Sequence, residues 1–120
     1  MEPPAASVLV VDDDQSLRLL SRLVLELEGF EVHDAASVAE AEDALAARRF
    51  DVVLMDVNLV GENTRELLVR VRAEGIPVAA VTGSADIAEL EQVADATLTK
   101  PFEPAALVAT ARRLARVEER

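Results

Sequence analysis

Short apolar runs alternate with amphipathic stretches five times along this chain. The apolar runs have the length of strands and lie at 8–11, 31–35, 51–55, 78–81 and 96–99. The amphipathic stretches have the length and spacing of helices and lie at 15–28, 38–47, 64–74, 86–93 and 104–117. Strands that alternate with helices in this way predict a parallel sheet covered by helices on both faces.

Few chain topologies are compatible with such a sheet. Crossovers between parallel strands are right-handed, and the flavodoxin-like strand order 2-1-3-4-5 is common at this size. We therefore predict an α/β fold with a doubly wound, five-stranded parallel sheet in this order and five helices. The 120 residues contain no internal repeat or low-complexity linker, so we expect one domain over 1–120.

Local signals mark the ends of several predicted helices. Asp14 is placed to cap the helix at 15–28, and Gly29 is placed to stop it. Ser37, with Glu40 three residues later, is typical of a helix start. The apolar residues at helical spacing in the helix at 15–28 are Leu17, Leu20, Val24 and Leu27.

Composition excludes several classes of protein. There is no cysteine, which rules out disulfides and thiolate chemistry. Twelve basic residues against 23 acidic ones give a net charge of -11, so direct nucleic-acid binding by this chain is not expected. The N-terminus lacks the features of a signal peptide, and no apolar run approaches the ~20 residues needed to span a bilayer. We expect a cytoplasmic protein without membrane contact.

Five residues with reactive or charged side chains lie at the ends of predicted strands. They are Asp12, Asp13, Asp56, Thr82 and Lys100. The carboxyl ends of the strands share one edge of an open parallel sheet, and ligands bind at that edge. Strands one and three would be neighbours, which brings the three carboxylates together. This inventory suits Mg²⁺ and a phosphoryl group, with Asp56 able to act as a nucleophile toward phosphorus.

Each of these residues also has an ordinary structural explanation. Asp12 and Asp13 could simply start a helix, where carboxylates favour the dipole. Asp56 could be a solvated loop residue, and Lys100 could form a structural ion pair with it. We favour the functional interpretation because Asp56 beside two other carboxylates is costly unless a cation neutralises the cluster.

Four segments resemble a known family, the receiver domains of bacterial two-component response regulators. The segments are VLVVDDD at 8–14, DVVLMDV at 51–57, PVAAVTG at 77–83 and LTKPF at 98–102. The resemblance covers essentially the whole chain. It implies a signalling phosphoprotein that promotes its own phosphotransfer and dephosphorylation, rather than an enzyme acting on other substrates.

The resemblance also implies a role for each site residue. Asp56 would accept a phosphoryl group from a sensor histidine kinase or a histidine phosphotransfer protein. Mg²⁺ would be held by Asp12, Asp13, Asp56 and the backbone carbonyl of Asn58. Thr82 and Lys100 would bind the phosphoryl oxygens, with Lys100-Pro101 in the cis arrangement of the family. The residues at the positions that tune the lifetime of the acyl phosphate are Asn58 and Ser84.

The chain departs from the family pattern in three places. Thr97 stands where Tyr or Phe is usual, and that aromatic residue normally moves inward on phosphorylation. The stretch from Thr82 to Lys100 is shorter than usual by roughly four residues, about one helical turn, so the fourth helix should be shortened. Val60 and Thr64 stand where Pro and Gly are common. We expect an atypical output face, and the downstream effector cannot be named.

Rival functions differ from this one in testable ways. A pseudo-receiver would be a protein-interaction module with the same fold and no phosphorylation cycle. A metal-dependent phosphatase would need a second catalytic acid near Asp56, where Asn58 stands. A nucleotide-binding enzyme is disfavoured because there is no Gly-rich phosphate loop. His33, the one histidine, is predicted to be an exposed strand residue away from the site.

Overall fold

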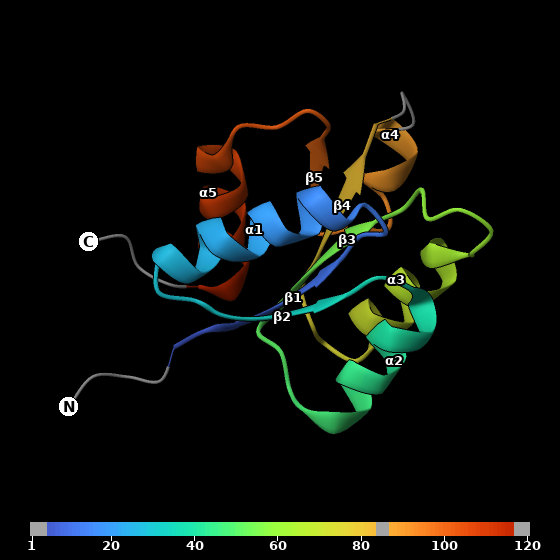
Figure 1. Cartoon of the computed structure of the whole chain (residues 1–120). Coiled ribbons are helices and arrows are strands. Elements are labelled where there is room, and N and C mark those ends of the chain that lie inside the picture. The colour runs from blue at the N-terminus through green and yellow to red at the C-terminus, as the bar shows by residue number, and fades with distance from the viewer. Residues whose placement is uncertain (1–4, 84–86, 117–120) are drawn as a thin grey trace.

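The computed structural model describes residues 5–83 and 87–116, and its central element is a five-stranded parallel sheet (Figure 1). The strands are β1 (Ser7–Val11), β2 (Glu31–Ala35), β3 (Val52–Asp56), β4 (Val78–Thr82) and β5 (Ala96–Thr99). They pair in the order β2-β1-β3-β4-β5, and every neighbouring pair is parallel. The predicted fold class and strand order are confirmed.

Helices cover both faces of the sheet. They are α1 (Gln15–Leu27), α2 (Val38–Ala47), α3 (Thr64–Ala73), α4 (Ile87–Leu90) and α5 (Pro104–Ala115). Helices α1 and α5 lie on one face, and α2 and α3 lie on the other (Figure 1). In the part of the chain that the structure describes, no helix is long and apolar enough to cross a membrane.

The strands divide the core into two layers because their side chains alternate between the two faces. Val8 and Val10 pack with the residues of α1 and α5, whereas Leu9 and Val11 pack with those of α2 and α3. All four are buried. Strands buried on both faces need near-continuous apolar sequence, which explains why these runs do not alternate with polar residues.

The predicted helix caps are present. The side chain of Asp14 accepts a hydrogen bond from the Leu17 N–H at 3.1 Å, and that of Ser37 accepts one from the Glu40 N–H at 3.1 Å. Gly29 follows α1 with a φ of +93°, a left-handed conformation that favours glycine. Most predicted element boundaries agree with the structure to within one or two residues.

Two helices differ from the sequence-based expectation in instructive ways. Helix α4 ends at Leu90, three residues before the predicted end, and its predicted first residue, Asp86, lies outside the described residues. Helix α1 has the predicted extent, but its buried residues are Ser21 and Leu25. Two of the periodic leucines of α1, Leu20 and Leu27, are exposed. The periodicity therefore predicted the helix without identifying its buried face.

Candidate functional site

The strand ends bring the predicted site residues together at the carboxyl edge of the sheet. Asp12 follows β1, and its backbone N–H continues the pairing with β2 by donating to the Ala35 carbonyl at 3.0 Å. Asp56 is the last residue of β3, and Thr82 is the last residue of β4. Lys100 follows β5 and donates its backbone N–H to the Thr82 carbonyl at 2.8 Å. Backbone hydrogen bonds thus hold these residues in place.

Three carboxylates form a cluster at this edge. One carboxylate oxygen each from Asp12, Asp13 and Asp56 lies within 4.8 Å of the others. Asp12 and Asp56 are buried, with exposed fractions of 5% and 4%, and Asp13 is exposed. Hard divalent cations prefer carboxylate oxygens, and Mg²⁺ keeps several waters when one or two carboxylates bind it. The three carboxylates, one of them exposed to solvent, therefore fit Mg²⁺.

The ammonium of Lys100 lies between the two buried carboxylates. Its Nζ is 2.7 Å from Asp56 Oδ2 and 3.1 Å from Asp12 Oδ2. Both contacts are hydrogen-bonded ion pairs at a partly buried place, where charges interact more strongly than at a fully solvated surface. The peptide bond between Lys100 and Pro101 is cis, as the resemblance implied. The ion pair with Asp56 that we considered from sequence is present.

The second oxygen of Asp56 faces the loop that follows β3. Oδ1 accepts a hydrogen bond from the backbone N–H of Asn58 at 2.7 Å. The side-chain amide of Asn58 donates to Thr82 Oγ1 at 3.0 Å, and Thr82 is fully buried. Asn58 therefore connects Asp56 with Thr82 across two neighbouring strand ends. Ser84, the other predicted lifetime position, lies outside the described residues.

Burial and charge shift two pKa values in this cluster. Burial raises the pKa of the Asp12 carboxyl, and the nearby charge of Asp56 adds to this rise, although the Asp14 N–H and Lys100 oppose it. Burial alone would lower the pKa of Lys100, but its hydrogen bonds to Asp56 and Asp12 and their charges outweigh burial and raise it. Lys100 is therefore a cation at neutral pH, and burial makes ionisation of Asp12 less favourable than it is for a carboxyl group in water.

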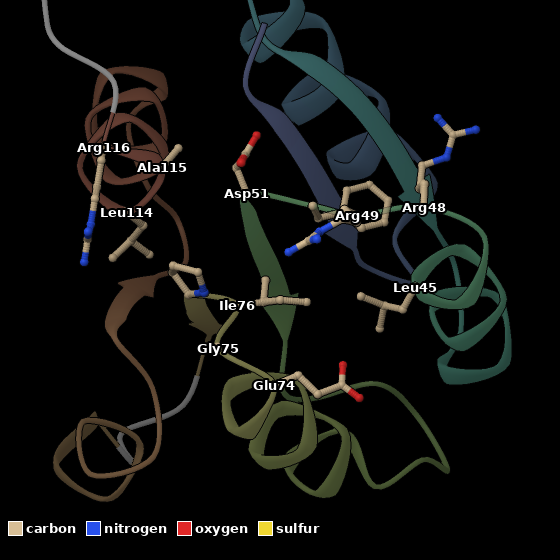
Figure 2. Close-up of a pocket in the computed structure, with 12 residues that line it drawn as sticks. Leu45, Arg48, Arg49, Asp51, Glu74, Gly75, Ile76, Leu114, Ala115 and Arg116 are labelled. Atoms are coloured by element: carbon tan, nitrogen blue, oxygen red, sulfur yellow. The ribbon is translucent and has the colours of Figure 1, made fainter. Parts of the chain in front are cut away.

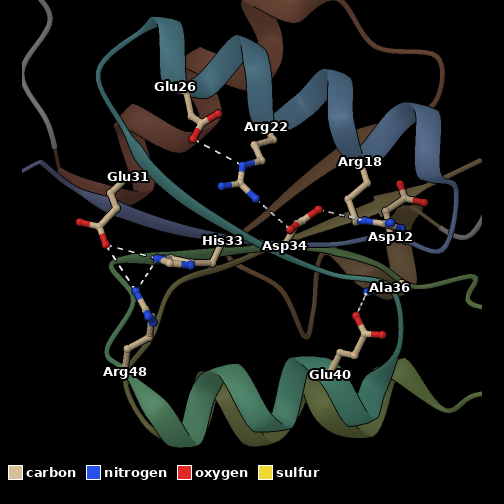
Figure 3. A network of polar contacts seen from close by, with 10 residues as sticks. All are labelled: Asp12, Arg18, Arg22, Glu26, Glu31, His33, Asp34, Ala36, Glu40 and Arg48. Atoms are coloured by element: carbon tan, nitrogen blue, oxygen red, sulfur yellow. Dashed lines mark hydrogen bonds and ion pairs between the residues drawn. The ribbon is translucent and has the colours of Figure 1, made fainter.

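Arg18 is a supporting residue that the sequence analysis did not identify (Figure 3). Its guanidinium donates to the backbone carbonyl of Asp12 at 2.9 Å and to Asp34 Oδ2 at 3.0 Å. Arg18 is on α1 and Asp34 is on β2. Through these two contacts, Arg18 links Asp12, the residue that follows β1, to both α1 and β2. A basic residue four positions after the helix cap was the available signal, because it returns to the cap side of the helix.

The loop after β3 contains the two other predicted departures. The backbone N–H of Val60 points at Asp13 Oδ2, at 3.4 Å, and its side chain is 86% exposed. Thr64 is the first residue of α3 and is buried. Its hydroxyl has no hydrogen-bond partner among the described residues. The loop retains a contact with the carboxylate cluster without the usual Pro and Gly.

A pocket and the histidine of this chain both lie away from the carboxylate cluster. A pocket of about 550 Å³ lies at the opposite, amino-terminal edge of the sheet and contains none of the predicted site residues (Figure 2). His33 is on β2, where it contacts Glu31, Arg48 and Phe50. Its side chain is 31% exposed, so the prediction of an exposed residue is only partly right.

Comparison with known sequences identifies the family. Residues 8–112 match the response regulator receiver domain. The DNA-binding response regulator MtrA of Mycolicibacterium smegmatis is 37% identical over 125 aligned positions, covering 99% of this chain and 55% of MtrA. MtrA of Mycobacterium tuberculosis (strain ATCC 25618 / H37Rv) is 36% identical over 117 positions, covering 93% and 51%. The chain thus spans about half the length of these relatives.

Solved structures agree with the sequence match. A CheY-like receiver domain protein from Methanospirillum hungatei has a TM-score of 0.85 at 29% identity, covering 93% of this chain and 94% of that one. The chemotaxis response regulator CheY4 of Vibrio cholerae has a TM-score of 0.82 at 31% identity, covering 92% and 98%. Together with the sheet order and the match over residues 8–112, these likenesses show that the chain belongs to the response regulator receiver domain family.

Proposed function

We propose that Asp56 accepts a phosphoryl group in a Mg²⁺-dependent reaction of a two-component signalling system. The observation that carries the proposal is the cluster of Asp12, Asp13 and Asp56, whose oxygens lie within 4.8 Å. Lys100 lies against two of these carboxylates. A buried carboxylate nucleophile next to a cation site and an ammonium is the arrangement that phosphoryl transfer needs.

The transfer step exchanges one bond to phosphorus for another. A carboxylate oxygen of Asp56 attacks the phosphorus of a phosphohistidine on the donor protein. The P–N bond to the imidazole breaks, a P–O bond to Asp56 forms, and the imidazole keeps the electron pair and takes up a proton. The product on this chain is an aspartyl phosphate, which water later hydrolyses to restore the carboxylate.

The neighbouring residues stabilise this step through charge and position. Asp12, Asp13, Asp56 and the Asn58 carbonyl would hold Mg²⁺, which neutralises charge on the phosphoryl oxygens when bound. Lys100 leaves its resting contact with Asp56 Oδ2 and binds a phosphoryl oxygen as a point charge. Thr82 donates its hydroxyl proton to another phosphoryl oxygen, while its Oγ1 can still accept from the side-chain amide of Asn58.

Family membership supports a class of phosphoryl donor, and the α4–β5 stretch bears on the output face. A sensor histidine kinase or a histidine phosphotransfer protein is the donor class that family membership supports. MtrA is named a DNA-binding response regulator and is about twice as long as this chain. We expect residues 1–120, with their net charge of -11, not to contact nucleic acid themselves. Short α4 and Thr97 in β5 support an atypical output face.

Phosphorylation by a small donor tests the proposal directly. The protein is incubated with Mg²⁺ and acetyl phosphate, and intact-mass spectrometry measures the addition of one phosphoryl group. Asp56→Asn should abolish the addition, and chelation of Mg²⁺ should prevent it in the wild type. Asp43→Asn is the matched control, because Asp43 is an exposed aspartate on α2.

The result also separates the receiver from a pseudo-receiver. Addition that persists in Asp56→Asn would place the acceptor elsewhere and overturn the proposal. If the wild type gains no mass with acetyl phosphate or with a panel of phosphorylated histidine kinases, a pseudo-receiver becomes the better explanation. The chain has no Trp or Tyr, so mass spectrometry or phosphate-affinity gels are preferable to intrinsic fluorescence.

A further inference from the structure

A side chain from α1 holds the peptide that joins Asp12 and Asp13. Arg18 donates from Nη1 to the carbonyl oxygen of Asp12 at 2.9 Å. Because the peptide group is planar, the direction of this carbonyl is set by the ψ angle of Asp12 and the φ angle of Asp13. The same two angles decide how the two carboxylates are directed relative to each other. Arg18 therefore acts on two members of the carboxylate cluster through the backbone that they share.

The two aspartates differ in how firmly their side chains are held. Asp12 Oδ1 accepts from the Asp14 N–H at 2.9 Å, and Asp12 Oδ2 lies 3.1 Å from Lys100 Nζ. Asp13 is exposed, and its Oδ2 accepts from the Val60 N–H at 3.4 Å. A long contact at an exposed position constrains a side chain weakly. The direction of the Asp13 carboxylate therefore depends more strongly on the backbone that Arg18 holds.

Arg18 is itself fixed by a carboxylate on β2. Its Nε donates to Asp34 Oδ2 at 3.0 Å, and the two side chains are 15% and 21% exposed. The guanidinium thus bridges the Asp34 carboxylate and the Asp12 carbonyl through two different nitrogens (Figure 3). A planar guanidinium makes two such contacts in fixed directions, whereas an ammonium acts as a point charge. The contact with Asp34 therefore sets the direction from which Arg18 reaches Asp12.

Asp34 also removes an electrostatic obstacle to cation binding. The Arg18 guanidinium carries a positive charge next to the residues that would hold Mg²⁺, and like charges repel. Asp34 neutralises this charge, and its other oxygen accepts from Arg22 Nη1 at 3.2 Å. Arg22 is paired in turn with Glu26 at 3.4 Å, so the network contains two cations and two anions. The network can therefore hold the backbone of Asp12 without adding net charge.

We propose that Arg18 is a positioning residue for the Mg²⁺ site and that Asp34 holds it in place. Arg18 orients the peptide between Asp12 and Asp13, so that both carboxylates are directed at one cation. This inference rests on the proposed function, because it concerns the metal site that phosphoryl transfer to Asp56 needs. Residues that orient metal ligands typically contribute about 10- to 100-fold to metal affinity.

Calorimetric titration of the unphosphorylated protein with Mg²⁺ tests the inference, because it measures metal affinity without any phosphoryl transfer. Arg18→Gln should raise the Kd for Mg²⁺ by about tenfold or more. Arg18→Lys should also raise it, because an ammonium keeps the charge but does not reproduce the two directed contacts. Arg70→Gln is the matched control and removes the same charge from the protein. Arg70 lies on α3 and pairs with Glu42 at 2.9 Å, so its loss should change the Kd by less than about twofold.

The sign of the change separates positioning from a simple charge effect. If Arg18 acted by its charge alone, its removal would take a positive charge away from the site and would tighten Mg²⁺ binding. A lower Kd in Arg18→Gln would therefore overturn the inference. Thermal melts followed by circular dichroism establish that each variant is folded at the temperature of the titration. A role confined to fold stability would lower the melting temperature and leave the Kd of the folded protein unchanged, which would also overturn the inference.

A double-mutant cycle tests the role of Asp34. Asp34→Asn should raise the Kd for Mg²⁺ in the wild-type background, because Arg18 then loses its charged partner. The same substitution should change the Kd by less than about twofold when Arg18 is already replaced by Gln. Equal effects in both backgrounds would show that Asp34 does not act through Arg18 and would overturn the inference. If Arg18→Gln does not fold, Arg18→Lys takes its place in the cycle.

Phosphorylation by acetyl phosphate separates a failure of this inference from a failure of the proposed function. At saturating Mg²⁺, the rate for Arg18→Gln should be within about threefold of the wild-type rate, and at low Mg²⁺ the loss should follow the higher Kd. If the wild type binds Mg²⁺ and is phosphorylated at Asp56, but Arg18→Gln binds Mg²⁺ equally well, the inference fails and the proposed function stands. A wild type without measurable Mg²⁺ binding would overturn both.

Discussion

The carboxyl edge of β1 and β3 carries the cluster of charged side chains, whereas the α4–β5 stretch lies outside that cluster and departs from the family pattern. At the β1–β3 edge, Asp12 and Asp56 come from neighbouring strands and lie against Lys100. In the α4–β5 stretch, the helix has four residues in the part of the chain that the structure describes, and Thr97 stands where the family resemblance leads us to expect an aromatic residue. The comparison shows that the carboxylates and the ammonium meet at one sheet edge even though the described part of α4 is short.

The physical reason is that the two regions are held in different ways. The positions of Asp12, Thr82 and Lys100 depend on backbone hydrogen bonds between strand ends. Helix α4 contributes Leu90 to the core, and the residues after it form turns rather than another helical turn. Shortening a surface connection costs little as long as the strands that it joins keep their register.

Loss of Lys100 should have the largest effect on the chemical centre. Lys100→Gln should lower the rate of phosphorylation by acetyl phosphate by about 10²- to 10³-fold, the usual cost of losing one preorganised charge-stabilising group. Mg²⁺ affinity should not fall, because the ammonium no longer competes for Asp56 and Asp12. Stopped-flow phosphorylation and calorimetric Mg²⁺ titration measure the two quantities separately. A parallel loss of Mg²⁺ affinity would contradict this assignment of Lys100.

Asp12→Asn should separate fold stability from metal binding. The pKa of Asp12 is raised in the folded protein, so protonation of this carboxyl stabilises the folded state. This stabilisation is fully present at pH values below the pKa of an unfolded-state carboxyl. It is lost as the pH rises through the pKa of Asp12 in the folded state. At neutral pH without metal, the variant should therefore melt at a higher temperature than the wild type. The difference should vanish under acid conditions, where the wild-type carboxyl is also neutral.

Metal addition should reverse this order. With Mg²⁺ at about 100 times its Kd, the wild type should gain about 2.7 kcal/mol of unfolding free energy, and Asp12→Asn should gain much less. Calorimetric melts of both proteins across pH, with and without Mg²⁺, give these values. A wild type that is more stable than Asp12→Asn without metal at neutral pH would argue against the raised pKa.

Thr64→Val tests the loop between the two regions. The Thr64 hydroxyl is buried without a hydrogen-bond partner among the described residues, so replacing it with a methyl group of similar size should stabilise the fold. The expected gain is about 1 kcal/mol, measured by urea unfolding. Thr110→Val, at a half-buried position of α5, is the matched control for a general effect of the substitution. An equal gain in both variants would show that the Thr64 hydroxyl is not special.

The smallest effect is expected in the α4–β5 stretch. Thr97→Tyr restores the residue type usual for the family, but Thr97 is not one of the residues that form the carboxylate and ammonium cluster. The phosphorylation rate should therefore change by less than about twofold, or roughly 0.4 kcal/mol in the barrier. The same stopped-flow assay checks this. A large change in rate would show that the two regions are coupled.

Much of the fold could be predicted because it depends on local patterns. Five apolar runs separated by helical stretches define the strands, and the right-handed crossover rule then leaves few strand orders. The placement of Asp12, Asp56, Thr82 and Lys100 at one edge follows from the same topology. A short α4 was also expected, because the stretch from Thr82 to Lys100 is shorter than the family norm by roughly four residues, about one helical turn.

Other features could not be predicted because they depend on contacts between distant segments. Leucines occur on several sides of α1, so periodicity could not tell that Ser21 and Leu25 face the sheet while Leu23 and Leu27 face solvent. Arg18 reaches Asp34 on β2 and the Asp12 carbonyl only because α1 lies across those strand ends. The link from Asn58 to Thr82 likewise joins residues from two separate strands.

The sequence by itself determined the strands and helices and limited the strand order to a few possibilities, because strand and helix periods are properties of neighbouring residues and crossovers are right-handed. Only the tertiary structure decided which face of α1 is buried and how Lys100 divides its contacts between Asp56 and Asp12. Those outcomes depend on distances across the fold, where packing and charge, rather than local preference, select one arrangement.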